Sequence, residues 1–217
     1  LSLFLLQKVS SLEKTAGNGV PYWMYVCFMI GTVCILLSLG LLLYDRSQEL
    51  QAQRITQELA PALEQAIAQR AQQRREDPPP AEEEAPVQPE ITLNGEVYLG
   101  LLSIPALELE LPVRRDLTDG ALKLSPCRYA GSVEDGGLVI AAHNYRQHFA
   151  KLSALRPGDL IRLTDADGGV HDYTVVQTET LAGDAAAEMT DGRWDLTLFT
   201  CTYGGGSRLT VRCIRAE

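Results

Sequence analysis

The sequence predicts an all-β domain, a sandwich or a closed barrel, that follows a membrane-spanning helix and a helical stalk. From residue 97 onward, short apolar runs alternate with turn residues, which is typical of all-β architectures and not of alternating βαβ units. Residues 22–44 contain no charged side chain, and this stretch is long enough to cross a bilayer core about 30 Å thick. Residues 45–76 are rich in Gln, Ala, Glu, Leu and Arg, which favour helix.

Composition and cysteine count narrow the possible functions. The chain has 217 residues and a formal net charge of −9, which argues against nucleic acid binding because phosphate affinity needs an excess of Lys and Arg. Its five cysteines form no Cys-x-x-Cys pair, and no histidines accompany them at zinc spacing. We therefore expect no disulfide framework, no metal site and no cofactor.

The N-terminal segments are predicted from charge and hydropathy. Residues 1–21 are expected to be a short tail, and residues 22–44 a transmembrane helix with aromatic interface anchors at both ends. The alternatives for this helix are a buried helix of a soluble protein and a cleaved signal peptide. The first rarely stays uncharged for so long, and the second has a shorter apolar region, so we favour the anchor.

A helical stalk is predicted over residues 45–76, because apolar residues recur there at roughly helical spacing, at Leu50, Ile55, Leu59, Leu63 and Ile67. A stripe this narrow could form a dimerising seam, but it has too few clean heptads for a coiled coil, so we expect a solvated stalk. Pro61 is expected to kink or interrupt it. Residues 77–90 combine prolines and glutamates, which predicts an extended linker before a folded domain at residues 91–217.

Within residues 91–217, alternating apolar residues predict strands at Val97–Ser103, Leu109–Val113, Leu138–Ala142, Asp159–Leu163, Val170–Thr178, Leu196–Cys201 and Leu209–Ile214. Short helical turns are expected at Leu117–Leu124 and Gln147–Leu155. The stretch Asp165–Gly169 faintly resembles a calcium loop, but it lacks the remaining ligands and the closing Glu, so we expect a hairpin turn there.

The last two predicted strands carry a candidate reactive pair. Cys201 ends one strand, a Gly-rich connection follows, and Arg208 begins the next strand, so an antiparallel arrangement brings both to the same rim. A nearby cation favours the thiolate, and a guanidinium can steady an oxyanion. Of the three histidines, His143 follows an apolar strand at the point where it reaches the surface. The alternatives are a buried structural cysteine, a solvated arginine and a structural histidine.

At these residues the sequence resembles a known family. The pentapeptide Thr197–Cys201 is similar to the Thr-Leu-x-Thr-Cys signature of the sortases, and Ser207–Val211 is similar to the arginine strand that follows it. The resemblance extends over residues 97–215, where Tyr98–Pro105 is similar to the first strand and Leu138–Phe149 to the histidine segment. Sortases are membrane-anchored cysteine transpeptidases of mainly Gram-positive bacteria. The resemblance implies their closed eight-stranded β-barrel for residues 91–217.

The resemblance also implies a mechanism. Cys201 would attack the carbonyl between Thr and Gly of an LPXTG-like sorting signal to give a thioester, and His143 would protonate the departing amine. An amine of a cell-wall precursor or a pilin lysine would then attack, while Arg208 holds the substrate and steadies the oxyanion. Thr200, Ala142 and Asn144 are expected to bind substrate. Ala142 stands where the family commonly has glycine.

Charge leaves the orientation of the membrane helix open, since Lys8 and Lys14 precede it while Arg46 and Arg54 follow it. The resemblance implies a single pass through the cell membrane, with residues 1–21 in the cytoplasm and the catalytic domain outside the cell. Two alternatives stay open. One is a membrane-anchored extracellular cysteine protease, and the other is a non-catalytic β-domain that binds wall or protein partners.

Overall fold

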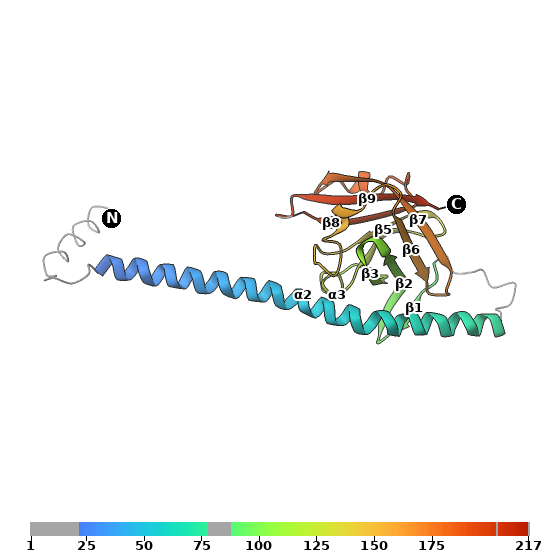
Figure 1. Ribbon diagram of the computed structural model, residues 1–217, viewed down its shortest axis with the longest axis horizontal. Helices are drawn as coiled ribbons and strands as arrows, with labels where there is room; N and C mark the ends of the chain where they lie inside the picture. Colours follow the sequence, from blue (N-terminus) through green and yellow to red (C-terminus); the bar gives the residue numbers. More distant parts are fainter. Residues whose placement is uncertain (1–21, 78–87, 203, 217) are drawn as a thin grey trace. The chain divides into compact units, whose positions relative to one another are not determined.

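The computed structural model describes residues 22–77, 88–202 and 204–216, and the chain divides into two units, Leu1–Ser47 and Gln48–Glu217. One long helix, α2 (Tyr22–Glu76), belongs to both units (Figure 1). The predicted tail at 1–21 and most of the predicted linker, residues 78–87, lie outside the described residues.

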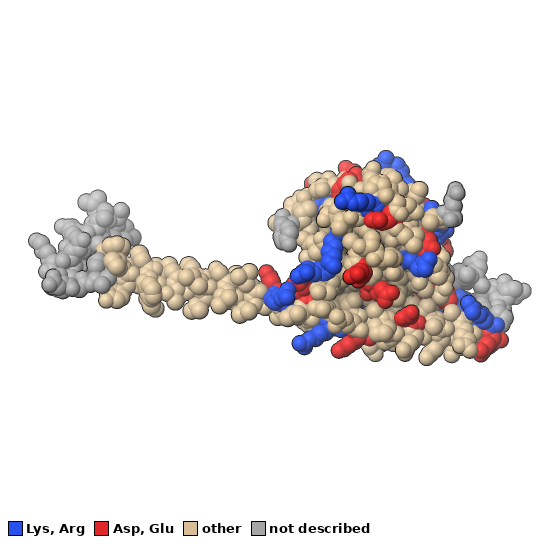
Figure 2. Space-filling view, viewed as in Figure 1, with Lys and Arg blue, Asp and Glu red and all other residues tan. Residues whose placement is uncertain are grey.

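In the first unit, α2 carries no charged side chain from Tyr22 to Tyr44. An 18-residue window reaches a mean hydropathy of 2.6 with none of it buried, and Figure 2 shows no acidic or basic atoms along this stretch. The hydroxyls of Thr32 and Ser38 donate to the carbonyls of Phe28 and Cys34, each at 2.8 Å, so the helix itself satisfies them. By length and composition, this is the one helix among the described residues that could cross a membrane, and it fits the predicted anchor.

The second unit is built on a sheet of nine strands in the order β1-β2-β3-β4-β5-β8-β9-β7-β6. Antiparallel pairing of β6 with β2 closes eight of these strands into a barrel, and β1 extends β2 outside the ring. The all-β prediction and the closed eight-stranded barrel are thereby confirmed. The strands are β1 (Ile91–Leu93), β2 (Glu96–Ile104), β3 (Leu109–Arg114), β4 (Cys127–Ser132), β5 (Gly136–Ala141), β6 (Leu160–Asp165), β7 (Val170–Ala182), β8 (Leu196–Cys201) and β9 (Ser207–Arg215).

Short helices join some of the strands. They are the 3₁₀-helices η2 (Pro105–Leu107) and η3 (Leu152–Ala154) and the α-helices α3 (Asp119–Leu124) and α4 (Ala186–Met189). The Thr118 hydroxyl caps α3 by accepting a 3.0 Å hydrogen bond from the Ala121 amide, which satisfies one of the donors that a helix start leaves free. The helical turn predicted over 117–124 is therefore present, whereas α4 was not predicted.

Side chains on the two faces of the central strands belong to two different apolar clusters, one inside the barrel and one outside it. Leu138 and Ile140 of β5 and Leu198 of β8 are fully buried inside the barrel. Their neighbours Ala141 and Phe199 face outward and form a second cluster with Val139 and Met189. Because α4 folds over this outer face, both faces of the sheet are covered here, and the candidate site lies at the edge of the outer cluster.

The stalk part of α2 packs on the barrel, so the expectation of a solvated stalk is wrong for one face of it. Leu63 is fully buried, and together with Leu59 and Ile67 it forms an apolar cluster with Tyr98 and Leu101 of β2. The apolar stripe at helical spacing in the sequence is the face of α2 that packs on β2. The helix also continues through Pro61, so the interruption expected there as one of two outcomes is absent.

Charged groups at the β6–β7 hairpin also hold the stalk. The carboxylate of Asp167 pairs with Arg74 and, at 2.7 Å, with Nε of Arg70. The hairpin itself was predicted and is confirmed by the antiparallel register of Thr164 with Val170. At its base, Asp165 is buried and pairs with His171 at 2.7 Å. Residues of the stretch Asp165–Gly169 thus form the predicted hairpin turn and an ion pair with α2.

Candidate active site

Cys201 and Arg208 are register partners across the last hairpin of the barrel. Cys201 ends β8, Arg208 is the second residue of β9, and the two strands are antiparallel. Directly opposed residues on such strands have Cβ atoms about 4.5–5.5 Å apart. The two residues therefore lie at the same rim, as predicted from the sequence, and the Cys201 side chain is partly exposed.

His143 leaves the sheet beside Cys201. Strands β5 and β8 are parallel neighbours with Ala141 opposite Phe199, and the amide of Ala142 donates to the Phe199 carbonyl at 3.2 Å. His143 lies two residues beyond Ala141, and Cys201 lies two residues beyond Phe199. Parallel strands that are in register end at the same edge, so the structure brings these two residues to one end of the sheet.

An apolar cleft of about 220 Å³ opens beside Cys201 and Arg208. It lies on the outer face of the sheet, between α3 and the connection that contains α4. Most of its wall is apolar, and its lining includes Leu117, Leu122, Tyr129, Ala182, Met189 and Phe199. His143 is not among the lining residues. The cleft can hold an apolar segment of a ligand with one end against the thiol.

Three tilted rings pack against one another in the loop that carries His143. The His143 and Tyr145 rings have centroids 5.0 Å apart, and the Tyr145 and His148 rings have centroids 5.6 Å apart. The Phe149 amide donates to the His143 carbonyl at 3.3 Å and closes the loop. His148 is fully buried, and this burial lowers its pKa to about 4, so it is neutral at pH 7.

The His143 imidazole is also neutral at pH 7. Its pKa is lowered from the ordinary value of 6.5, first by partial burial and then by the nearby cation of Lys123, while Asp119 acts in the opposite direction. Lys123 and Asp119 both belong to α3. A neutral imidazole is ready to accept a proton, as a general base must.

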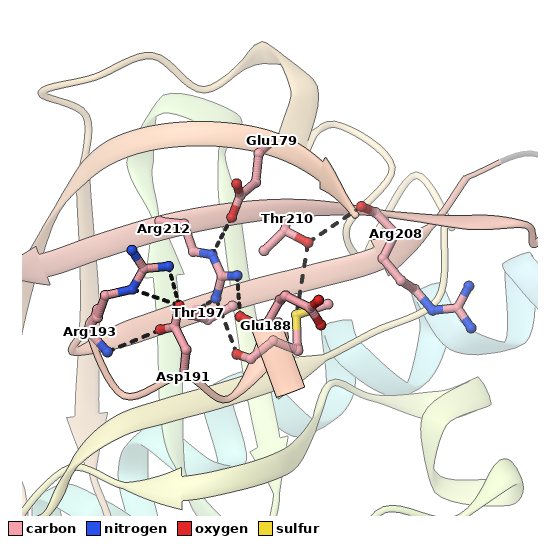
Figure 3. A network of polar contacts seen from close by, with 9 residues as sticks. Glu179, Glu188, Asp191, Arg193, Thr197, Arg208, Thr210 and Arg212 are labelled. Carbon is pink, nitrogen blue, oxygen red and sulfur yellow. Dashed lines mark hydrogen bonds and ion pairs between the residues drawn. The ribbon is translucent and has the colours of Figure 1, made fainter. Parts of the chain in front are cut away.

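Arg208 is held at the rim by its own loop. Its Nη1 group donates to the carbonyls of Gly205 and Ser207 at 2.9 and 3.2 Å. Figure 3 shows its side chain pointing away from the cluster around Arg212. Arg208 also lines the cleft, so a ligand there would meet a fixed cation next to the thiol.

Arg212 is buried, although it occupies a polar position in the alternating sequence of β9. Only 2% of it is exposed. Its Nε pairs with Glu179 at 2.7 Å, and its Nη1 donates to the hydroxyl of Thr197 at 3.0 Å (Figure 3). Alternation places Arg212 on the outer face with Arg208, where a sequence pattern predicts solvent. No local signal in the sequence indicates that the connection around α4 covers it.

The three predicted substrate-binding residues do not line the cleft. Thr200 is 2% exposed and shares the inward-facing alternation of Leu198. Ala142 belongs to the inner apolar cluster, and Asn144 is half-buried in the loop after His143. None of the three is among the described residues that line the cleft, and their role in substrate binding stays a prediction.

Comparisons with known proteins agree with this architecture. A family model described as Sortase domain matches residues 102–216. Sortase A of Bacillus anthracis is 29% identical over 119 residues, which cover 51% of this chain and 55% of that protein. The chain thus spans about half the length of the curated relative it matches.

Solved structures show the same fold. Sortase C of Streptococcus pneumoniae aligns with a TM-score of 0.53 at 23% identity, covering 76% of this chain and 97% of that one. Sortase C1 of Streptococcus agalactiae aligns with a TM-score of 0.52 at 24% identity, covering 70% and 88%. The Sortase D5 transpeptidase of Clostridium perfringens aligns with a TM-score of 0.54 at 15% identity, covering 77% and 99%.

The family match covers more than half of the chain, and the matched region contains His143, Cys201 and Arg208. Members of this family are membrane-associated cysteine transpeptidases, which agrees with the apolar helix and with the thiol at the rim of the cleft. The chain therefore belongs to the sortase family.

Proposed function

We propose that this protein cleaves an LPXTG-like sorting signal between Thr and Gly and transfers the resulting acyl group to an amine of a cell-wall precursor or a pilin lysine. The observation that carries this proposal is the register pairing of Cys201 with Arg208 beside an apolar cleft, with His143 two residues beyond the end of the neighbouring strand β5. Family membership supports it, and the related Sortase C of Streptococcus pneumoniae has pilin substrate specificity.

In the first half of the reaction, neutral His143 accepts the thiol proton of Cys201 while the sulfur attacks the Thr carbonyl carbon. Arg208 donates to the oxygen that becomes negatively charged. The tetrahedral intermediate collapses, the carbon–nitrogen bond breaks, and His143 gives its proton to the departing Gly amine. The products are a thioester on Cys201 and a peptide with a free N-terminus.

In the second half, an acceptor amine attacks the thioester carbonyl and gives a proton to His143. Collapse of this intermediate breaks the carbon–sulfur bond, and the proton returns to the Cys201 sulfur. The apolar cleft suits the Leu and Pro of the signal, because apolar side chains lose contact with water there. Arg208 would orient the segment next to the scissile bond.

The purified full chain incubated with an LPXTG-type peptide and an amine acceptor tests this function. We expect a thioester adduct on the protein and a product in which the acceptor replaces the Gly. Hydrolysed peptide without transfer would favour the cysteine protease. If the protein formed no adduct and iodoacetamide left Cys201 unmodified at neutral pH, the protein would be a non-catalytic β-domain.

The activity should depend on pH through His143, with opposite effects from two residues of α3. A protonated His143 cannot accept the thiol proton, so kcat/KM should fall as pH decreases through its pKa, which lies below 6.5. Lys123→Met removes a cation that opposes protonation, so this acid limb should move to higher pH. Asp119→Asn should move it to lower pH. Shifts of the same sign in both variants would contradict this assignment.

We also propose that the catalytic domain lies outside the cell, as the family's substrates require. Protease added to intact protoplasts should remove the domain that begins near Ile91 and should leave the segment before Tyr22 protected. Immunoblots against tags at the two ends would measure this. Protection of the C-terminal tag would overturn an exported enzyme.

A further inference from the structure

The connection between β7 and β8, residues 183–195, forms one wall of the cleft beside Cys201. Residues 183–186 and Met189 line the cleft, and α4 carries Met189 over the outer face of the sheet. Met189 itself is 4% exposed and contacts the outer apolar cluster. The position of α4 therefore determines the width of the cleft on this side.

One buried arginine ties α4 to the sheet. Arg212 donates from Nη2 to the carbonyl of Glu188 at 2.7 Å and from Nη1 to the carbonyl of Met189 at 3.1 Å (Figure 3). These are the last two residues of α4, and the last carbonyls of a helix have no partner within it. Arg212 thus caps this short helix from the sheet below.

The Arg212 guanidinium also contacts side chains of two other strands. Glu179 of β7 pairs with Nε at 2.7 Å, and the hydroxyl of Thr197 of β8 accepts from Nη1 at 3.0 Å. The guanidinium is planar, and its donors reach the two strands and two consecutive carbonyls at once. A lysine has a single charged nitrogen and cannot make the same set of contacts.

We propose that Arg212 is a positioning residue that holds the α4 wall of the cleft and thereby sets the affinity for the peptide substrate. This proposal rests on the proposed function for its substrate. Arg212 does not line the cleft, so it acts through Met189 and the segment at 183–186 and not on the reacting atoms. Loss of its contacts should weaken substrate binding and leave the chemical step intact.

Arg212→Lys is the decisive variant, and Glu179→Gln is its matched control. Arg212→Lys keeps a cation next to Glu179 but loses the contacts with the α4 carbonyls. We expect KM for the peptide to rise about ten-fold, which is the lower end of what one apolar contact in a pocket is worth. The value of kcat should stay within about two-fold, since no group that acts in the transition state is removed.

The wall can also be probed without substrate. The Arg193 side chain is 77% exposed and follows α4 in the same connection, so trypsin can cut there once the connection loosens. We expect faster cleavage after Arg193 in Arg212→Lys, measured by mass spectrometry well below the Tm. Glu179→Gln removes the charge but keeps an oxygen acceptor for Nε and leaves the two α4 carbonyl contacts in place, so it should lower Tm but leave KM and cleavage after Arg193 unchanged.

An unchanged KM and an unchanged cleavage rate in Arg212→Lys would overturn the proposal. The proposal is also overturned if Glu179→Gln raises KM and the cleavage rate in proportion to its loss of Tm, because Arg212 is then only a stabilising residue. If Arg212→Lys does not fold, Thr197→Val removes one anchor of the guanidinium at constant volume and should raise KM and speed cleavage to a smaller extent. If the wild type forms no acyl-enzyme, the proposed function fails, while cleavage after Arg193 still decides whether Arg212 holds the wall.

Discussion

Replacement of Cys201 by Ala should abolish thioester formation on an LPXTG-type peptide. The alanine methyl group cannot form a bond to the carbonyl carbon, and neither His143 nor Arg208 can substitute for the sulfur. Loss of the nucleophile in a comparable hydrolytic triad costs about a million-fold in kcat. Intact-protein mass spectrometry after incubation with peptide should show the acyl adduct on the wild type and no adduct on Cys201→Ala.

Two other cysteines of the barrel provide matched controls. Cys127 and Cys213 are fully buried, and burial raises the pKa of each thiol to about 12, so both stay protonated and inert near neutral pH. Cys127→Ala and Cys213→Ala should therefore retain the adduct. Equal loss in all three variants would indicate damage to the fold, and an adduct on Cys201→Ala would show that another group is the nucleophile.

Arg208→Lys should lose turnover by about a hundred- to a thousand-fold, the usual effect of removing one oxyanion donor. The Nη1 contacts with the Gly205 and Ser207 carbonyls fix the plane of the guanidinium at the rim. Nε and Nη2 belong to the same plane and point further donors in fixed directions. Lysine keeps the charge but loses this geometry. Steady-state kcat with the peptide, together with an unchanged Tm, measures the effect.

The matched control for Arg208→Lys is Arg215→Lys and not Arg212→Lys. By sequence, Arg212→Lys is expected to be nearly silent, but Arg212 is buried in hydrogen bonds to α4 and is unsuitable. Arg215 lies on the same strand and is exposed. Arg215→Lys should change kcat by less than about two-fold, as surface substitutions usually do. Wild-type activity in Arg208→Lys would show that Arg208 is an ordinary rim arginine.

Much of the barrel could be predicted because its strands are short apolar runs bounded by turn residues. β8 and β9 alternate apolar and polar residues, β2 and β5 are nearly continuous apolar runs, and the predicted ranges overlap the observed strands. β4 was missed because Cys127–Ser132 shows no clean alternation, and register shifts interrupt its pairing with β5 at two places. β1 has only three residues, which is too short for a periodic signal.

The sequence by itself determined the apolar helix, most strands, and the motif that joins Cys201 to Arg208. These features depend on local hydropathy, local alternation and a short hairpin, so neighbouring residues contain the information. Only the tertiary structure decided the rest. Parallel pairing of β5 with β8 places His143 and Cys201 at the same edge of the sheet, the stalk buries its apolar stripe on β2, and α4 covers Arg212. Each of these contacts joins segments far apart in the chain, and the free energy of burying a side chain depends on a partner that local sequence does not specify.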